Sequence, residues 1–475
     1  MNLPKIIQGG MGVAISDWRL AHAVSSLGHL GVVSGTGISH ILSARLQDGD
    51  PGGNTRRALA HFPFPEAVER VLKRYFVEGG IPPGKAYKRP VLWNIKPQRD
   101  LVELTIIANF VEVFLAKEGH GNPVGINLLE KVQMPTISSL YGAMLAGVDF
   151  VLMGAGIPMQ IPGILDQLAK HEPTRYRIDV VGGKEEHFLH FDPNELFQGL
   201  ADFLKRPMFL PIISSFVLAQ ALIKRATGYI DGFVVETPIA GGHNAPPRGT
   251  VEYNDEGEPI YTEKDVVDLE KLKTLERPFW LAGGYGNAEK LVEALDAGAA
   301  GIQVGTAFAY CDESGMEASI KQQVIDKVLS EGVRVHTSSV VSPTGFPFKV
   351  VRVEGTLADR DVYQTRERVC DIGYLRHQYE KEDGTLGYRC SAEPVDQFVK
   401  KGGSADDTEG RVCLCNCLVA TAGFGQRRSS GAVEPQMVTS GDDLPNIRQF
   451  LKDGATRYSA ADVVAELERV ALAVA

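Results

Sequence analysis

Short runs of β-branched and other apolar residues recur along the chain, each followed by a glycine-bearing turn and a stretch compatible with a helix. Because these runs are continuous rather than alternating, they are typical of strands buried on both faces of a parallel sheet. We place eight strands at residues 6–8, 31–34, 124–128, 150–154, 208–213, 232–236, 279–283 and 301–305. Eight strands that alternate with helices predict an α/β fold, namely a (β/α)₈ TIM barrel.

The remaining segments predict additions to this barrel. Residues 91–95 (VLWNI) are a ninth strand candidate that competes with 124–128, and we assign them to an insertion at about 40–120. After about residue 350 the chain becomes richer in charge, Tyr and Cys, so we divide it into a barrel at 1–350 and an appended module at 351–475. Residues 459–474 predict a closing helix with Ser459 as its N-cap, and 287–297 predict a helix of the barrel.

Charge and hydropathy exclude several classes of protein. The net charge of −10, without a basic run to offset it, argues against nucleic-acid binding. No apolar run approaches the roughly 20 residues that a membrane span needs. The N-terminus lacks the charged and apolar regions of a secretory signal. We therefore expect a cytoplasmic protein that binds neither nucleic acid nor membrane, and leave a homodimer open.

Five of the six cysteines lie in the last quarter of the chain. Cys413, Cys415 and Cys417 alternate with other residues, so a strand would place all three on one face, where Cys390 or Cys370 could complete a Cys₄ site. The C-x-C-x-C spacing differs from the C-x₂-C pairs of structural zinc and Fe–S motifs. We therefore expect buried thiols and no metal.

Glycines gather at the carboxyl ends of the predicted strands, where a TIM barrel keeps its active site. Backbone amides beside glycine can approach a ligand closely and bind an anion. Gly283-Gly284 and Gly305-Thr306 follow the last two strands and predict a phosphate site, the alternative being tight turns without a ligand. The remaining strand-end glycines are Gly9, Gly10, Gly12, Gly154, Gly241 and Gly242.

Polar and soft side chains accompany these glycines. His243 follows the sixth strand in AGGHNAPPRG and predicts a proton-transfer group, the alternative being a loop histidine bonded to the backbone. Asn244 belongs to a rigid rim around it, and Arg248 suits an anionic group of a substrate. Met11, after two glycines, suits the face of a planar cofactor, although core packing is a competing interpretation.

Three motifs in this order resemble the nitronate monooxygenase (2-nitropropane dioxygenase-like) family over about residues 1–320. They are PKIIQGGMG with LAHAVSSLGHLGVVSGTG, then AGGHNAPPRG, then FWLAGGYG with GAAGIQVGTAFAYCDES. The resemblance implies a TIM barrel that binds FMN. It implies that His243 is the base or substrate-orienting residue and that Gly283, Gly284, Gly305 and Thr306 hold the FMN phosphate. It further implies flavin contacts at Gln8, Gly9, Gly10, Met11, Gly12, Asn127 and Ser214, to which we add Gly154, Gly241 and Gly242.

The resemblance implies an oxidation of alkyl nitronates with O₂ to a carbonyl compound and nitrite. However, residues 40–120 and 350–475 exceed the minimal family barrel. The tail, with YRCSAEP and VCLCNCLVATAGFGQ, resembles the longer branch of polyunsaturated fatty acid and polyketide synthesis, which includes trans-acting enoyl reductases. The alternative is therefore reduction of an enoyl thioester, with NAD(P)H as electron donor. A non-catalytic FMN-binding scaffold and a phosphate-sugar barrel enzyme without flavin are also compatible with the sequence.

Overall fold

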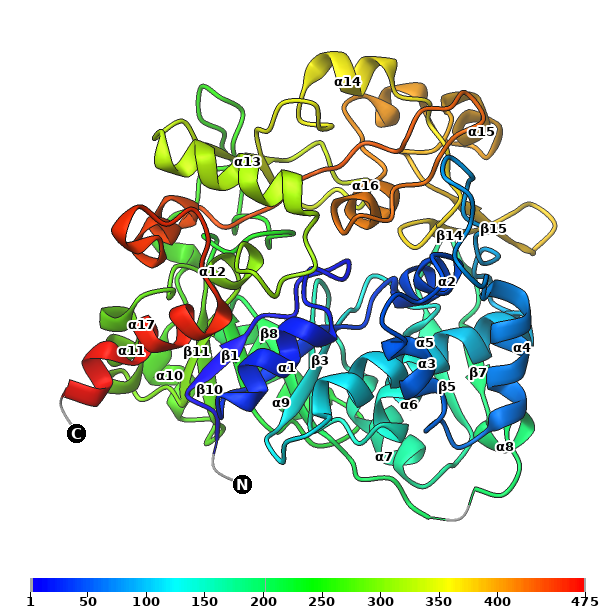
Figure 1. Ribbon diagram of the computed structural model, residues 1–475, viewed down its shortest axis with the longest axis horizontal. Coiled ribbons are helices and arrows are strands. Elements are labelled where there is room, and N and C mark those ends of the chain that lie inside the picture. The colour runs from blue at the N-terminus through cyan, green and yellow to red at the C-terminus, as the bar shows by residue number, and fades with distance from the viewer. Residues whose placement is uncertain (1–2, 201, 474–475) are drawn as a thin grey trace.

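The structure is a computed structural model that describes residues 3–200 and 202–473, and its centre is a parallel sheet of eight strands (Figure 1). The strand order is β1-β11-β10-β9-β8-β4-β3-β2. A parallel bridge between Ile7 and Leu30 joins the two ends of this order, so the sheet closes into a barrel. The strands are β1 (Ile6–Gln8), β2 (Gly31–Ser34), β3 (Val124–Leu129), β4 (Phe150–Gly154), β8 (Met208–Ile213), β9 (Phe233–Glu236), β10 (Phe279–Ala282) and β11 (Gly301–Val304).

The predicted TIM barrel is thus confirmed, and all eight predicted strands are present to within one residue at each end. The ninth candidate at residues 91–95 forms no strand. That segment is an irregular stretch before a helix, in which Trp93 is buried and side chains bond to the backbone. The Trp93 carbonyl accepts from Arg376, and Ile95 N donates to Tyr388 Oη at 2.8 Å.

Large apolar side chains fill the inside of the barrel. Trp280 is fully buried there, and its indole N–H donates a 2.7 Å hydrogen bond to the carbonyl of Pro4 at the amino end of β1. The cluster that packs with it is Ile7, Leu30, Val32, Phe150, Leu152, Leu210, Val234 and Ala282. Because the interior is packed, a ligand can bind only at a rim of the barrel, as is usual for this fold.

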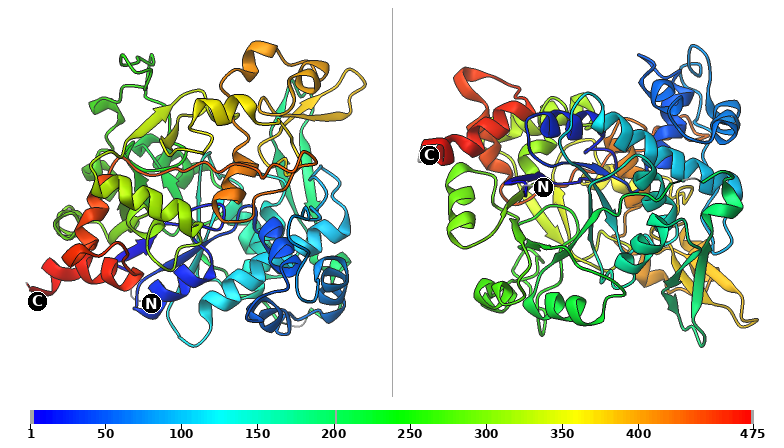
Figure 2. Two further views of the ribbon diagram at one scale, coloured as in Figure 1. Left: turned by 45° about the horizontal axis from the view of Figure 1, so that its top comes forward. Right: turned by 90° about the horizontal axis from the view of Figure 1, so that it is seen from below.

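Helices surround the barrel (Figure 2). The helices that come after β1, β3, β4, β8, β9 and β10 in the chain are α1 (Trp18–Ser26), α6 (Thr136–Leu145), α7 (Ile161–Ala169), α9 (Phe216–Arg225), α10 (Leu269–Lys273) and α11 (Ala288–Asp296). The Asn287 side chain accepts a 2.8 Å hydrogen bond from Lys290 N and so caps α11, which confirms the helix predicted at 287–297.

The segment between β2 and β3 contains α2 (Ile38–Gln47), α3 (Asn54–Leu59), α4 (Pro65–Tyr75) and α5 (Arg99–Lys117). Helix α5 packs against α1 and α6 and also contacts β2 and β3. It therefore occupies the position of the barrel helix that connects these two strands. The other three helices lie on the outer side of this position (Figure 1).

Short antiparallel strands and short helices lie outside the barrel sheet, in the part of the chain between β4 and the tail. They are the pair β5 (Thr174–Ile178) and β7 (His187–Phe191), with β6 (Val180–Val181) and α8 (Pro193–Leu196) beside them, and the hairpin β12 (Val335–Ser338) with β13 (Phe348–Val351). A 3₁₀-helix η1 (Glu263–Asp265) follows β9, and α12 (Thr306–Ala309) and α13 (Ala318–Leu329) follow β11.

The C-terminal segment lies across one end of the barrel and returns to its side (Figures 1 and 2). Its elements are α14 (Arg360–Thr365), β14 (His377–Glu380), β15 (Leu386–Arg389), α15 (Val395–Lys400), η2 (Ala405–Thr408), α16 (Leu414–Thr421), η3 (Leu444–Phe450), η4 (Lys452–Gly454) and α17 (Ala460–Ala473). Strand β14 pairs with β6, which ties this segment to the barrel's own excursion after β4.

The last helix completes the ring around the barrel. Helix α17 packs against α11 and α1, on either side of the β11–β1 seam, through the buried residues Val463 and Leu467. Ser459 Oγ accepts a 3.2 Å hydrogen bond from Asp462 N, so the predicted N-cap is confirmed. The last predicted residue of this helix, Val474, lies outside the described residues. Among the described helices, none is both long and apolar enough to cross a membrane.

The close contact between α5 and α6 generates a stability prediction. A Cβ at Gly142 in α6 would lie 2.0 Å from the Ile106 carbonyl oxygen of α5. We expect Gly142→Ala to lower the free energy of unfolding by about 1–3 kcal/mol, because overpacking outweighs the better helix propensity. Urea unfolding measures this change. Gly121→Ala is the control, since a Cβ there meets nothing within 4 Å. Equal stability of the two variants would contradict the tight α5–α6 contact.

Candidate functional site

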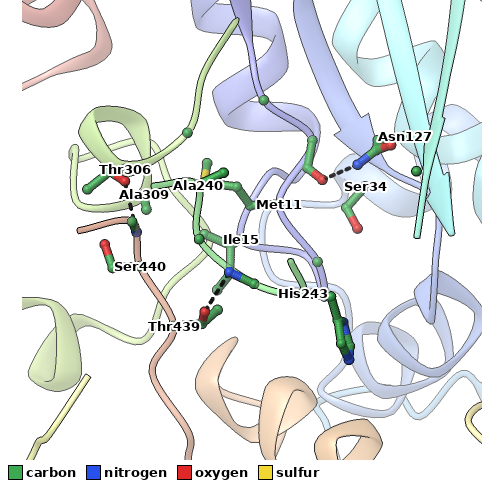
Figure 3. Close-up of a pocket in the computed structure, with 18 of the residues that line it drawn as sticks. Met11, Ile15, Ser34, Asn127, Ala240, His243, Thr306, Ala309, Thr439 and Ser440 are labelled. Atoms are coloured by element: carbon green, nitrogen blue, oxygen red, sulfur yellow. Dashed lines mark hydrogen bonds between the residues drawn. The ribbon is translucent and has the colours of Figure 1, made fainter. Parts of the chain in front are cut away.

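A cavity of about 260 Å³ lies at the carboxyl ends of the barrel strands. Most of the residues predicted for the site line this cavity, and Figure 3 shows how several of them face one another. They are Gly9, Gly10, Met11, Gly12, Asn127, Gly154, Gly241, Gly242, His243, Gly283, Gly284, Gly305 and Thr306. The fold thus brings together loops that are up to about 300 residues apart in the sequence.

The loop after β1 is held in shape by its own polar groups. Ser16 Oγ donates a 2.8 Å hydrogen bond to the Gly9 carbonyl and accepts one of 2.8 Å from Met11 N. Asn127 Nδ2, at the end of β3, donates to the Gly10 carbonyl at 2.8 Å. A Cβ at Gly10 would lie 2.3 Å from the Asn127 Cβ, so glycine is required for this approach.

The late glycine loops meet the tail at the other side of the cavity. Gly283 and Gly284 have φ values of +84° and +78°, which favour glycine. Thr306 Oγ1 donates to Asp443 Oδ1 at 2.8 Å and accepts from Gly441 N at 3.1 Å. The segment that follows Met437 therefore forms a wall over the predicted phosphate loops (Figure 3).

His243 lies at the cavity beneath the loop of the β12–β13 hairpin. Its Nε2 shares a 2.7 Å hydrogen bond with Ser342 Oγ, and its ring meets the Phe348 ring edge-on, with centroids 4.9 Å apart. Ser342 Oγ in turn bonds to Thr344 Oγ1 at 2.8 Å. The imidazole is therefore oriented by a side chain far along the sequence, as a proton-transfer group requires.

The surroundings of His243 keep its imidazole neutral. Burial, with a smaller effect of the Lys131 charge, lowers the pKa of His243 to about 3. The Lys131 amine is itself buried, lies over the Phe346 ring, and has no hydrogen-bond partner among the described residues. Burial lowers the pKa of Lys131 to about 7. At neutral pH the histidine is thus a neutral donor or acceptor rather than a cation.

Three predicted residues lie in a separate side pocket of about 60 Å³. They are Ser214, Asn244 and Arg248. The Arg248 guanidinium donates to the backbone carbonyls of Lys264 and Ser214, and its backbone N–H donates to Asp265 Oδ1 at 2.8 Å. The structure does not bring these residues onto the main cavity, so their cofactor and substrate roles remain predictions.

Sequence reasoning missed two groups of cavity residues. The first is Glu236, the polar residue that ends the apolar run FVVE at the barrel rim. The second is the tail, which contributes Tyr374, Leu375, Leu414, Cys415, Leu418, Met437, Thr439, Ser440, Gly441 and Asp443. The run Thr439-Ser440-Gly441 carried a usable signal, because small residues beside glycine are typical of anion-binding loops.

The cysteine-rich region contains no strand that aligns three thiols. Cys413 is the N-cap of α16, and Cys415 and Cys417 lie within that helix, so the alternating-strand arrangement is wrong. The helix forms because the apolar residues around them, such as Leu414 and Val419, pack inward. The described cysteines are free thiols, mostly buried.

One group of candidate metal ligands lies away from the cavity, among the described residues. Ligand atoms of Glu256, Glu258 and His336 lie within 4.8 Å of one another at a partly exposed rim. Exposed acidic groups commonly gather in this way without an ion. We therefore assign no metal site there.

Together, the closed parallel barrel and its glycine-lined cavity define an enzyme of the TIM-barrel class with its site at the carboxyl ends of the strands. Residues 177–342 match the nitronate monooxygenase family. The matched stretch includes His243, Gly283-Gly284 and Gly305-Thr306, but not residues 8–12 or the tail. The resemblance predicted from the motifs is confirmed over these residues.

Several solved structures are similar to this chain at low identity. FabK from Thermotoga maritima is 15% identical, with a TM-score of 0.49, over 100% of this chain and 95% of that one. A nitroalkane oxidase from Streptomyces ansochromogenes is 15% identical, with a TM-score of 0.47, over 100% and 98%. The enoyl reductase domain of MlnA from Bacillus amyloliquefaciens is 13% identical, with a TM-score of 0.48, over 99% and 97%. At these values the likenesses carry no further argument. No curated protein matches the sequence.

The neutral state of His243 predicts how stability depends on pH. The pKa of His243 is lower in the folded than in the unfolded chain. Its contribution to the free energy of unfolding is therefore fully present above pH 6.5 and is lost as the pH falls towards 3. When the pH is lowered from 7 to 5, we expect the free energy of unfolding of the wild type to fall by about 2 kcal/mol more than that of His243→Gln. Denaturant unfolding at both values measures the difference. The same change at the exposed His190 is the control, and identical slopes in all three proteins would contradict the burial of His243.

Proposed function

We propose that the protein is an FMN-dependent oxidoreductase that binds FMN across the barrel mouth and oxidises alkyl nitronates with O₂. The observation that carries this proposal is the convergence of the glycine loops after β1, β10 and β11 on one cavity that also contains His243. The match of residues 177–342 to the nitronate monooxygenase family supports the same chemistry. A cytoplasmic location and a homodimer remain predictions.

The polar groups of the cavity fit a flavin phosphate and ring. Asn127 Oδ1, Gln303 Oε1 and Ser440 Oγ are buried, line the cavity and have no hydrogen-bond partner among the described residues. Buried polar atoms without a partner are costly, and a ligand with donors and acceptors would satisfy them. The backbone of Gly284, Gly305 and Thr306 would hold the phosphate, and Met11 would contact the flavin ring.

When bound, FMN would supply the electron transfer, while the protein supplies position, shielding and proton control. The hydrogen bond to Ser342 fixes the direction of the His243 ring, so a neutral imidazole nitrogen can accept or share the proton of a substrate. The hairpin loop over His243 and the tail wall at Thr439–Asp443 cover part of the cavity and so limit the access of bulk water.

A second candidate function is reduction of an enoyl thioester, with NAD(P)H as the electron donor. One observation favours it, namely that the tail adds an apolar wall to the cavity. This wall consists of Leu375, Leu414, Leu418 and Met437, which lie beside Val132 and Phe348 of the barrel side. A small nitronate does not need such a surface, whereas an acyl chain buries against it.

Gly305 provides a test of cofactor binding. Its φ of −106° suits any residue, and a Cβ there meets only Met11 at 3.7 Å, so Gly305→Val would fold and place its side chain in the proposed FMN site. We expect FMN affinity to fall about 10- to 100-fold, as an overpacking cost of about 1–3 kcal/mol implies. Flavin fluorescence titration measures this affinity. Gly332→Val at an exposed turn is the control, and equal FMN binding by both variants would sink the phosphate-site assignment.

His243 provides a test of the chemistry. We expect His243→Ala to retain bound FMN and to lose about 10²–10⁴-fold in turnover, because the proton-transfer group is removed. Anaerobic mixing with propionate 3-nitronate, or with crotonyl thioester and NADPH, identifies which compounds change the oxidation state of the flavin. Bleaching by the nitronate alone supports the main proposal, and bleaching by NADPH with reoxidation by the thioester supports the second. Unchanged bleaching rates in His243→Ala would refute its role.

A further inference from the structure

Glu236 lies at the rim of the barrel, at the end of one strand. It ends β9, and the loop that carries His243 begins directly after it. Its side chain lines the main cavity and also the 60 Å³ side pocket. Glu236 therefore forms the partition between these two spaces.

Most of the buried glutamates of the described chain differ from Glu236, because a basic side chain pairs with them. Glu393 pairs with Lys401 and three others pair with arginine, whereas Glu130 has no such partner. Glu103 pairs with Arg70 and Arg99, Glu112 with Arg45, and Glu434 with Arg366 and Arg428. A buried carboxylate without such a partner destabilises the folded state, and an unpaired one in a cavity is typical of a functional site.

No group within the described residues offers Glu236 this compensation. Burial raises its pKa to about 7, and burial is the only cause of the shift. Arg248 shares the side pocket, but its guanidinium is engaged with the carbonyls of Lys264 and Ser214. Other titratable groups also face the two spaces. Those of the main cavity are His243, Tyr285, Tyr374, Cys415 and Asp443, and those of the side pocket are Tyr261 and Asp265.

The side pocket gives Glu236 a connection to solvent. Its lining combines polar and apolar groups, and it includes the exposed residues Pro246 and Arg248. A space of about 60 Å³ is large enough for water molecules. His243, in contrast, is enclosed by Ser342 and Phe348 and lies on the main cavity alone.

We propose that Glu236 is a further catalytic residue, which passes protons between water in the side pocket and the reacting substrate in the main cavity. This inference rests on the proposed redox function, in which a substrate atom gains or loses a proton as its electrons move. In the donating direction, the carboxyl O–H bond breaks, a bond from this proton to the basic atom of the substrate forms, and Glu236 becomes a carboxylate. A hydronium ion that reaches the side pocket from solvent then restores the acid and leaves water behind. His243 orients the substrate, while Glu236 exchanges its proton with solvent.

The first arm of the test uses protein from which flavin has been removed. Infrared difference spectra between wild type and Glu236→Gln, recorded across pH 5–9, isolate the carbonyl band of this one carboxylic acid. We expect the band to be present at pH 5 and to disappear around pH 7. Glu130→Gln is the matched control, since Glu130 is also buried with a raised pKa but lines neither space. A band for Glu236 that is absent throughout this range would overturn the proposal.

The second arm uses the flavin-loaded protein. We expect Glu236→Gln to retain FMN and to lose about 100-fold in turnover, together with the limb of the pH–rate profile near pH 7. Glu236→Asp should recover part of the rate, and Glu130→Gln should leave both rate and profile unchanged. A wild-type rate and profile in Glu236→Gln, with FMN fully bound, would overturn the proposal.

The two arms separate this inference from the proposed function. A wild type that binds no flavin refutes the redox function and the catalytic role together, whatever the infrared band shows. A wild type that binds flavin and turns over, while Glu236→Gln behaves identically, refutes the role of Glu236 alone. Loss of the Glu236 infrared band around pH 7, together with loss of the limb of the pH–rate profile in Glu236→Gln, supports both the redox function and the role of Glu236.

Discussion

The packed interior of the barrel is the constraint on which the rest of the structure depends. Trp280 and the large side chains around it occupy the space inside the strands, and the barrel is closed between β1 and β2. Chemistry is therefore confined to the loops at the rim. Those loops can then carry glycines, unpaired polar atoms and a buried carboxylate, because the apolar core provides the stability that such groups cost.

Much of the barrel could be predicted from the sequence because its strands are buried on both faces. Runs such as VLMG in β4 and MFLPII in β8 are continuous and apolar, and glycine marks where several of them end. The role of α5 was harder to predict, since it follows three other helices that separate it from β2. The run VLWNI has strand-forming residues, but whether a strand forms depends on a neighbour with which to pair.

The candidate site also has one part that the sequence predicts and another that it does not. Residues at strand ends, such as Gly283 and His243, could be predicted because the topology of a barrel fixes where strand ends meet. The contribution of the tail could not, because Thr439 and Asp443 reach Gly242 and Thr306 only through contacts across more than a hundred residues. Glu236 was hidden for another reason. A glutamate at a strand end is ordinarily solvated, and only the structure places it between two pockets without a partner.

The tail is attached to the barrel by two different kinds of interaction. Helix α17 is held by apolar packing, with Val463 and Leu467 buried between α1 and α11. The segment over the cavity combines apolar packing, through the buried Val438 and Leu444, with hydrogen bonds from Gly242 N to Thr439 Oγ1 at 2.8 Å and from Gly441 N to Thr306 Oγ1. Apolar packing contributes most of the stability of a fold, whereas single hydrogen bonds contribute about 1 kcal/mol each. Both α17 and the residues that flank the cavity wall are therefore anchored in the apolar core, and the hydrogen bonds to Gly242 and Thr306 set the position of the wall over the glycine loops.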